Sequence, residues 1–417
     1  MELEPRCYDK ILQLIEKGVD IPNPLTLDIG DEVIVEHISG NGVRIYPGCR
    51  IYGSKTLISS GAQIGAEGPA TVDNCQIGPE VLLKGGYFKE SVFLEGASMG
   101  LGAHVREGCL LEEQANGAHC IGLKQTILFP FVTLGSLINF CDCLMAGGTS
   151  RKDHSEVGSA YIHFNFTPEG DKTTASLIGD VPRGVMLNQP PIFLGGQGGM
   201  VGPLRVGYGN VVAAGSILRR DVIQDNKMII PKTHRSAVID FAPGAYTGLG
   251  RMVTNNLLYL ANLLALKQWY LHVRRSFFES CELGLLLYQG VLEKLEMAVA
   301  ERIKRLEAMG MKLSASETEL GKRKGLIGLK LEFTEKVQDV CEVFRNEAVA
   351  ESDSDVRDQF LEALDRHRTR HKDGYLETIT SLPTAVSEQG TKWLTGIVNA
   401  LMESASSVLP SFRLNKG

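Results

Sequence analysis

Residues 201–222 read VGPLRVGYGNVVAAGSILRRDV, and within them Val206, Val212 and Leu218 stand six residues apart. An α-helix repeats about every 3.6 residues and a strand about every 2, so this spacing belongs to neither. An aliphatic residue at every sixth position, separated by small residues that allow tight turns, is typical of a β-helix built from hexapeptide rungs. The stretch therefore predicts the fold before any chemistry is considered.

The same spacing recurs in the upstream part of the chain. It joins Ile45, Ile51 and Leu57; Ile77 and Leu83; Met99, Val105 and Leu111; and Ile121 and Ile127. Insertions such as residues 66–71 interrupt the register without ending it. Three rungs make one coil of roughly 18 residues, and each rung turns one aliphatic side chain into a stacked core. Residues 40–235 therefore supply on the order of ten coils.

The repeat gives way to a helical pattern near Ala242. Beyond it, apolar residues such as Val291, Leu295 and Val299 recur at helical spacing, with Glu and Lys on the other face. Helices are predicted at residues 7–17, 291–306, 331–350, 355–371 and 391–408. The chain thus divides into an N-terminal helix and linker (1–39), a β-helix (40–241) and an α-helical domain (242–417). We expect the last to pack on the solenoid or to join subunits.

Composition narrows the class of protein. The net charge of −6 argues against nucleic-acid binding as the main task. The nine cysteines are irregularly spaced, and Cys141-Asp-Cys143 has no second pair to complete a zinc site, so buried thiols in a reducing cytoplasm are expected. The N-terminus has no signal-peptide pattern, and the longest apolar run, residues 257–266, is too short to span a bilayer. These features predict a cytoplasmic protein without a membrane span.

A family resemblance begins at the short helix 7–17 and the segment Gly18-Val-Asp-Ile-Pro-Asn-Pro24 and extends to about His234. This part of the chain resembles the linker and left-handed β-helix domain of the bifunctional UDP-N-acetylglucosamine pyrophosphorylase and glucosamine-1-phosphate N-acetyltransferase family. The resemblance implies a left-handed parallel β-helix, a homotrimer with sites between subunits, and a sugar-phosphate or nucleotide-sugar ligand. It also implies acetyl-CoA or another acyl-CoA as donor.

The family's nucleotidyltransferase half opens with a glycine-rich loop that carries an arginine. This chain has no such segment before its coils, so we do not expect it to transfer uridylyl groups. A separate sugar nucleotidyltransferase is therefore a candidate partner.

The resemblance assigns residues to the sugar-phosphate side of the site. Ala103-His-Val-Arg-Glu-Gly108 and Ile121-Gly-Leu-Lys124 match segments whose cations contact the phosphate, which implies that role for Arg106 and Lys124. An arginine fork and a lysine point charge are well suited to one phosphate. The segment Val157-Gly-Ser-Ala-Tyr-Ile-His-Phe-Asn-Phe166 matches the sugar-binding segment, which implies sugar contacts for Asn165 and Phe166, and Lys172 lies at or beside another sugar-site lysine.

The catalytic position differs from the family pattern. Gly135-Ser-Leu-Ile-Asn-Phe-Cys-Asp142 matches the segment with the general-base histidine and a tyrosine, but here these positions are Ser136 and Asn139. A serine hydroxyl without a partner is a poor base near neutral pH. His154 and His163 are the candidate substitutes. His154 follows Ser136 by 18 residues, which in a regular solenoid would stack it one coil away, although the segment between Asp142 and Val157 is longer than in the family.

The acyl-donor side retains its shape. Phe193-Leu-Gly-Gly-Gln-Gly-Gly-Met-Val-Gly-Pro203 matches a turn whose serine meets the thioester, and that position is Gly196. Glycine permits close approach of a thin pantetheine arm and equally suits a solenoid corner. Ala213 and Ala214 match a strip of small residues that packs against coenzyme A, and Lys232 stands where an arginine reaches the cofactor's phosphates.

Two functions from different classes fit these residues. The first is an acyltransferase-like protein that binds a sugar phosphate or nucleotide sugar. The second is a β-helix without catalysis that serves as a scaffold or regulatory partner of a separate sugar nucleotidyltransferase. We predict no metal site, because the histidine pair of a γ-type carbonic anhydrase is missing, and no P-loop, because the glycines at 195–199 lack the following Lys-Ser/Thr.

Overall fold

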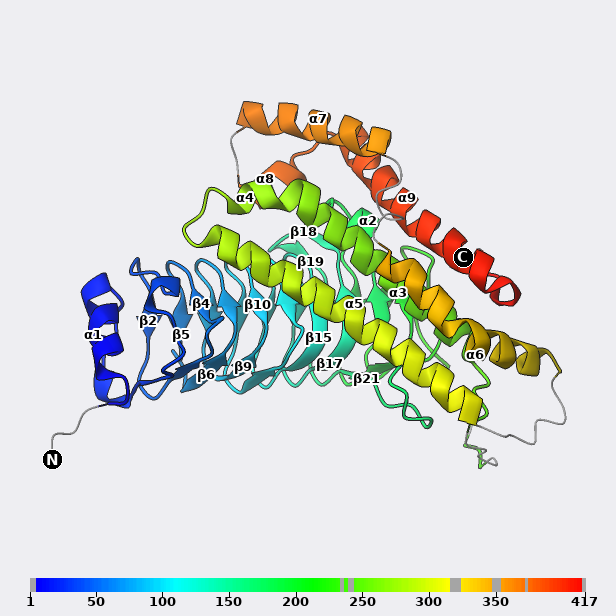
Figure 1. Cartoon of the computed structure of the whole chain (residues 1–417), viewed down its shortest axis with the longest axis horizontal. Coiled ribbons are helices and arrows are strands. Elements are labelled where there is room, and N and C mark those ends of the chain that lie inside the picture. The colour runs from blue at the N-terminus through cyan, green and yellow to red at the C-terminus, as the bar shows by residue number, and fades with distance from the viewer. Residues whose placement is uncertain are drawn as a thin grey trace.

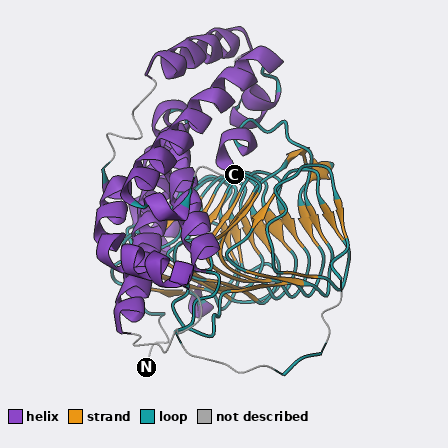
Figure 2. Cartoon of the chain, turned by 90° about the vertical axis from the view of Figure 1, so that its right-hand side faces the viewer, coloured by secondary structure: helices purple, strands orange, loops and turns teal. Residues whose placement is uncertain are grey.

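A computed structural model describes residues 5–232, 236–238, 244–315, 324–346, 354–371 and 374–414. The chain forms a parallel β-solenoid with a layer of helices along one side (Figures 1 and 2). Helix α1 (Tyr8–Lys17) lies at the first coils, and its buried Ile11 and Leu14 join the solenoid core. The architecture confirms the predicted β-helix followed by an all-α region.

Each coil contributes one short strand to each of three faces. In the described part of the chain the first face is a ten-stranded parallel sheet, which agrees with the predicted number of coils. Its strands are β2 (Arg44–Ile45), β5 (Gln63–Ile64), β8 (Leu82–Leu83), β11 (Ser98–Met99), β14 (Asn116–Gly117), β16 (Thr133–Leu134), β20 (Glu156–Val157), β23 (Phe193–Leu194), β26 (Val211–Val212) and β28 (Met228–Ile229).

A larger parallel sheet forms the second and third faces. The second face contains β1 (Asp28–Ile29), β3 (Arg50–Tyr52), β6 (Ala70–Asp73), β9 (Gly86–Lys89), β12 (Ala103–Val105), β21 (Ile162–Phe164), β24 (Gly199–Val201) and β27 (Ile217–Leu218). The third contains β4 (Leu57–Ile58), β7 (Gln76–Ile77), β10 (Val92–Phe93), β13 (Leu110–Leu111), β22 (Ser176–Ile178) and β25 (Arg205–Val206). Strands β15 (Gly122–Leu128) and β17 (Asn139–Met145) bend across both faces, because Gln125 and Asp142 adopt positive φ at the corner.

The six-residue repeat builds the core as predicted. Val206, Val212 and Leu218 are each at most 3% exposed, and the repeat residues upstream are equally buried. Strand register stacks them between coils: Val105 pairs with Leu123, and Leu134 with Val157. Each buried aliphatic side chain contributes roughly 1.5–3 kcal/mol of hydrophobic stabilisation, so the repeat supplies the main driving force for the solenoid.

Among the excursions that interrupt the coils between residues 146 and 193, two contain secondary structure of their own. The first is an antiparallel hairpin of β18 (Gly148–Ser150) and β19 (Asp153–His154). The second contains the short helix α2 (Val181–Gly184), whose N-cap Asp180 accepts a hydrogen bond from the Arg183 backbone N–H. Both lengthen their coils beyond the regular repeat, so residue spacing in this part of the chain no longer gives the stacking order.

The C-terminal region is helical, as predicted. Its helices are α3 (Leu249–Trp269), a π-helical turn (Tyr270–Arg274), α4 (Arg275–Phe278), α5 (Gly284–Ala315), α6 (Lys324–Arg345), α7 (Ser354–His371), α8 (Tyr375–Thr380) and α9 (Thr384–Val408), followed by a 3₁₀ turn at Pro410–Phe412. Two further 3₁₀ turns, Pro24–Thr26 and Val35–His37, lie in the N-terminal linker. The predicted segment 291–306 lies within α5, and 355–371 matches α7. Helix α6 begins before the predicted residue 331, and α9 begins before 391.

Helix α3 lies where the sequence showed only an apolar run. Its leucines are buried around most of the helix, including Leu257, Leu260 and Leu263, because it packs between the solenoid and the other helices. A helix buried on all sides lacks the polar face that marks helical periodicity. No helix among the described residues is long and apolar enough to cross a membrane.

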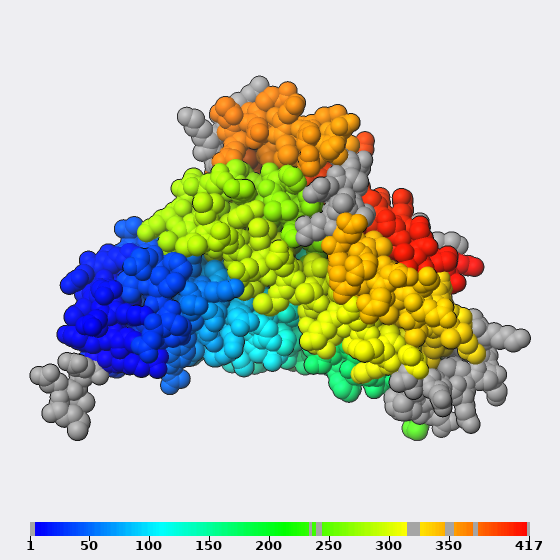
Figure 3. Space-filling view, in the orientation of Figure 1, coloured from blue at the N-terminus to red at the C-terminus, as the bar shows by residue number. Residues whose placement is uncertain are grey.

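The helices cover the third face of the solenoid. Helix α5 packs on β7 and β10, and α3 packs on β22. In Figure 3 the light green and yellow atoms of the helical layer lie directly over the blue and cyan coils. Buried polar contacts fix this layer: Arg274 pairs with Glu113, and Tyr270 donates to Glu112. The first and second faces carry no such helical layer in the described part of the chain.

Candidate functional site

One corner of the solenoid stacks Ser136, the position matched to the family's base, on the predicted donor turn. Backbone hydrogen bonds run down this corner from Leu137 N to His119 O (3.1 Å), from Ala160 N to Ser136 O (2.8 Å), and from Gln197 N to Ser159 O (2.8 Å). The last step joins Gly215 N to Gly196 O (2.9 Å). We call this stack the Ser136 column; from the N-terminal side its members are His119, Ser136, Ser159, Gly196 and Ala214.

Glycine is required in the column by the close approach of adjacent coils. A Cβ on Gly196 would lie 2.7 Å from Ser159 O, and one on Gly195 would overlap the Ala214 backbone. Gly215 adopts φ +71°, but a Cβ there would meet nothing within 4 Å. The C-terminal end of the column therefore presents a narrow strip of backbone and small side chains, in which Gly196 is partly exposed and Ala214 is exposed.

Ser136 has a hydrogen-bonding partner that the sequence did not suggest. Its Oγ lies 2.8 Å from Nδ1 of His119, on the preceding coil, and both side chains are accessible to solvent. The Ser136 backbone N–H donates to Ser159 Oγ at 3.2 Å. The sequence offered one sign of this contact, because His119 and Ser136 are 17 residues apart, which is close to the length of one coil. His119, however, lies outside every segment matched to the family.

The predicted phosphate residues meet at a second corner, between the second and third faces. The register of β9, β12 and β15 places Lys89, Arg106 and Lys124 at matching positions on three successive coils. We call these three residues the anion corner. Arg106 is exposed, whereas Lys124 forms an ion pair with Glu107, with about a third of each side chain accessible. The structure thus brings Arg106 and Lys124 together and gives Lys124 an acidic neighbour.

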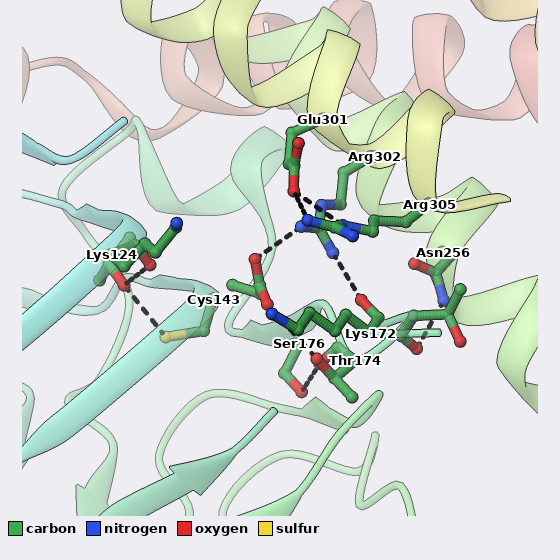
Figure 4. Close-up of polar contacts among 12 residues, drawn as sticks. Lys124, Cys143, Lys172, Thr174, Ser176, Asn256, Glu301, Arg302 and Arg305 are labelled. Carbon is green, nitrogen blue, oxygen red and sulfur yellow. Dashed lines mark hydrogen bonds and ion pairs between the residues drawn. The ribbon is translucent and has the colours of Figure 1, made fainter. Parts of the chain in front are cut away.

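Helix α5 reaches the next coils of this corner. Arg302 Nη2 donates to Asp142 Oδ1 at 2.6 Å, and both side chains are buried. Arg302 Nη1 donates to the backbone carbonyl of Lys172 at 3.3 Å (Figure 4). The backbone at Lys172 is therefore fixed by the helical layer, while its side chain remains exposed.

The two sugar-segment residues follow β21. Asn165 is half-buried, and the Phe166 ring is 75% exposed. The chain then leads through Asp171, whose carboxylate accepts hydrogen bonds from the Thr173 backbone and hydroxyl. The segment is thus anchored at Asp171 and presents Phe166 and Lys172 to solvent.

The two histidines proposed as bases occupy different environments. His163 lies inside the coil, 2% exposed, with Nε2 2.8 Å from Ser176 Oγ and its ring edge-on to Phe140. Burial lowers the pKa of His163 to about 4, so the imidazole is neutral at neutral pH. His154 is half-buried and pairs with Gly148 in the β18–β19 hairpin.

His154 does not stack one coil from Ser136, because the coil is longer than in a regular solenoid. The β18–β19 hairpin lengthens this coil, so the residue below Ser136 is Ser159, 23 positions along the chain. Neither His154 nor His163 belongs to the Ser136 column. Their catalytic roles remain predictions.

The remaining predicted residues lie at the end of the solenoid. Ala213 is half-buried beside the column, and Lys232 is exposed just after β28. His234 lies outside the described residues. Among the residues that the structure describes, no three His, Cys, Asp or Glu side chains are grouped as metal ligands.

Comparisons with curated proteins find relatives for about half of this chain. No family model matches the chain. The bifunctional protein GlmU of Thermotoga maritima is 27% identical over 214 residues, 51% of this chain and 42% of that protein. GlmU of Trichlorobacter lovleyi is 28% identical over 219 residues, 52% of this chain and 42% of that protein.

The chain therefore spans about two fifths of the length of these curated relatives. Among solved structures, a UDP-N-acetylglucosamine acyltransferase from Campylobacter jejuni matches at 15% identity with a TM-score of 0.19, over 49% of this chain and 67% of that one. The GlmU matches confirm the resemblance drawn from the residues.

Proposed function

We propose that this protein is an acyltransferase-like protein that binds a sugar phosphate or nucleotide sugar and takes its acyl group from acetyl-CoA or another acyl-CoA. The observation that carries the proposal is the Ser136 column. It aligns the family's base position at Ser136 with Gly196 and Ala214 on one open corner. The strip of small residues below Ser136 has the shape that a thin pantetheine arm would need.

The anion corner supplies the phosphate-binding side of the proposal. Arg106 offers a planar fork and Lys124 a mobile point charge, and Lys89 adds a third cation on the preceding coil. A bound phosphate would replace Glu107 as the partner of Lys124. Asn165, Phe166 and Lys172, further along the same side, would contact the sugar.

A homotrimer with sites between subunits would complete this arrangement. The Ser136 column and the anion corner bound opposite edges of the second face, so one chain presents them apart. Large apolar side chains point outward on the uncovered faces: Ile162 and Ile217 on the second and Phe193 on the first, each about 40% exposed. Leu137, beside Ser136, is 56% exposed. Such residues favour contact with another copy, which would bring one subunit's column to its neighbour's anion corner.

The remaining parts of the proposal come from the resemblance. A separate sugar nucleotidyltransferase would supply or consume the phosphosugar, and the protein would act in the cytoplasm. In the family mechanism a base removes a proton from the sugar amine, and His154 and His163 were the predicted candidates. For His163 to act, its imidazole would have to leave the buried contact with Ser176.

A scaffold without catalysis is the second candidate, and one observation favours it. The buried Arg302–Asp142 ion pair ties the helical layer to the coil beside Lys124, and Glu107 already neutralises Lys124. Charged side chains that are already paired within the chain are expected if the anion corner serves assembly and does not bind a ligand. In that case the uncovered faces would bind a nucleotidyltransferase partner.

Titration calorimetry on the full chain tests ligand binding. Glucosamine 1-phosphate, UDP-N-acetylglucosamine and acetyl-CoA are titrated separately, and at least one phosphosugar should give a heat of binding that is lost in Arg106→Ala. Arg50→Ala, an exposed arginine on an earlier coil of the same face, is the matched control and should bind normally. No heat with any of the three ligands would exclude the proposed function.

A thiol-release assay separates the enzyme from the scaffold. Acetyl-CoA and a panel of amino-sugar phosphates should release free coenzyme A only when the correct acceptor is present. Binding of a phosphosugar without any thiol release would favour the scaffold.

A further inference from the structure

The hydrogen bond between Ser136 and His119 joins a nucleophile to a base at the corner between the first and second faces of the solenoid. Ser136 Oγ and His119 Nδ1 are 2.8 Å apart, within the range for a nucleophile and its general base. The two residues come from adjacent coils, and the backbone bond from Leu137 N to His119 O holds those coils in register. The pair is therefore placed by the rigid repeat rather than by a loop.

Other members of the corner complete the surroundings of the pair. The Ser136 backbone N–H donates to Ser159 Oγ, which fixes the start of the turn.

We propose that Ser136 and His119 form a nucleophile and general base that carry the acyl group as an acyl-serine between donor and acceptor. The identity of the donor, an acyl thioester, rests on the proposed function. The pair itself rests on the geometry of the corner. This assignment gives Ser136 a chemical role in place of a lost histidine, and it makes His119 a catalytic residue.

The first step forms the acyl-serine. Ser136 Oγ attacks the thioester carbonyl carbon while His119 Nδ1, in the tautomer protonated on Nε2, takes the hydroxyl proton. The carbon–oxygen bond forms, the carbon–sulfur bond breaks, and the proton passes from His119 to the departing thiolate. The products are the acyl-serine and the free thiol, with His119 neutral again.

The second step transfers the acyl group to the acceptor amine. The amine nitrogen attacks the ester carbonyl, the carbon–nitrogen bond forms, and the bond to Ser136 Oγ breaks. His119 takes one proton from the amine and returns it to the serine oxygen. No oxidant or metal is needed, and the dyad ends in its starting state.

Covalent labelling of the full chain tests the pair without any sugar. The protein is incubated with acetyl-CoA in one arm and with p-nitrophenyl acetate, an activated ester, in the other, and intact mass and peptide mapping follow. One acetyl group should appear on Ser136. The label should be absent from Ser136→Ala, and His119→Gln should slow labelling by about 100-fold or more. Ser98→Ala, a partly exposed serine on the first face, is the matched control and should label normally.

The outcomes separate this inference from the proposed function. Labelling of Ser136 by p-nitrophenyl acetate but not by acetyl-CoA would support the dyad and count against coenzyme A as donor. Acetyl-CoA turnover that survives in Ser136→Ala would overturn the dyad and leave the acyltransferase proposal standing. Absence of a label on Ser136 with both reagents would also overturn it. Thermal unfolding of each variant, and recovery of labelling in Ser136→Cys, distinguish loss of chemistry from loss of fold.

Discussion

The second and third faces of the solenoid are built from the same inward-pointing rungs, yet one face is open and the other is covered. At the edges of the third face, Asp142 and Glu113 bind Arg302 and Arg274 from the helical layer. The second face exposes Ile162 and Ile217 and is bounded by the Ser136 column and the anion corner. The comparison teaches that the repeat decides the architecture, whereas the outward side chains decide what each face binds.

The largest expected effect comes from breaking the covered side. Arg274→Ala leaves Glu113 buried without its cation and should lower the free energy of unfolding by about 3–5 kcal/mol. Urea unfolding measures the loss. Arg275→Ala is the matched control because its pair with Glu279 is exposed, so its effect should stay within about 1 kcal/mol. Equal effects of the two variants would mean that the helical layer does not depend on the buried pair.

The pH dependence of the free energy of unfolding should report the protonation of His163, which is buried inside the coil behind the second face. Burial lowers its pKa from 6.5 to about 4, so the folded state binds fewer protons than the unfolded state between these values. The stability it contributes is present above about pH 6.5 and is lost as the pH falls toward 4, up to about 3 kcal/mol. Urea unfolding from pH 4 to 8 measures this slope, which should be smaller in His163→Gln.

Glu112 on the covered side contributes with the opposite sign. Burial raises its pKa to about 7, so its contribution is lost as the pH rises from about 4.5 to 7. The difference between wild type and His163→Gln cancels this term and isolates the histidine. His104→Gln, which removes an exposed histidine from the second face, serves as control. An unchanged slope in His163→Gln would mean that the imidazole is not buried in the folded protein.

A smaller effect is expected from adding a methyl group between coils of the Ser136 column. In Gly195→Ala the new Cβ would overlap the Ala214 backbone, so the free energy of unfolding should fall by about 1–3 kcal/mol. In Gly250→Ala, within α3, the Cβ meets nothing within 4 Å, and stability should rise by about 0.5–1 kcal/mol. Chemical unfolding of both variants checks the contrast. An unchanged free energy of unfolding in Gly195→Ala would show that the coils can separate beside Gly196 and Ala214.

The smallest change in stability is expected at the anion corner. Glu107→Gln removes the partner of Lys124, and because the pair is partly exposed, stability should change by less than about 1 kcal/mol. Phosphosugar affinity should instead rise several-fold, since Lys124 no longer has to leave a carboxylate. Scanning calorimetry measures the change in stability, and titration calorimetry measures the change in phosphosugar affinity. Glu293→Gln, which removes the partner of Lys55 in an exposed ion pair, is the control. Weaker binding in Glu107→Gln would mean that Glu107 itself contacts the ligand.

Prediction from sequence succeeded where the determinant was local. The spacing of Val206, Val212 and Leu218 indicated the rungs because every rung obeys the same short-range rule. Helix α3 was missed because a helix buried on all sides loses its periodic signal. His154 does not stack on Ser136 as it would in a regular solenoid, because the β18–β19 hairpin lengthens the coil. A column neighbour depends on the length of every insertion between two residues.

The sequence by itself determined the β-helix, from its six-residue spacing, and the helical region, from the change to a helical spacing. The roles of Arg106 and Lys124 came from the family resemblance, and the register of β12 and β15 places the two residues on neighbouring coils. Only the tertiary structure decided which face the helices cover and that Ser136 contacts His119 rather than His154. The physical reason is that the repeat fixes the direction of each side chain within a coil. Contacts between coils and layers depend on insertion lengths and on buried partners far away in the chain, such as Arg302 for Asp142.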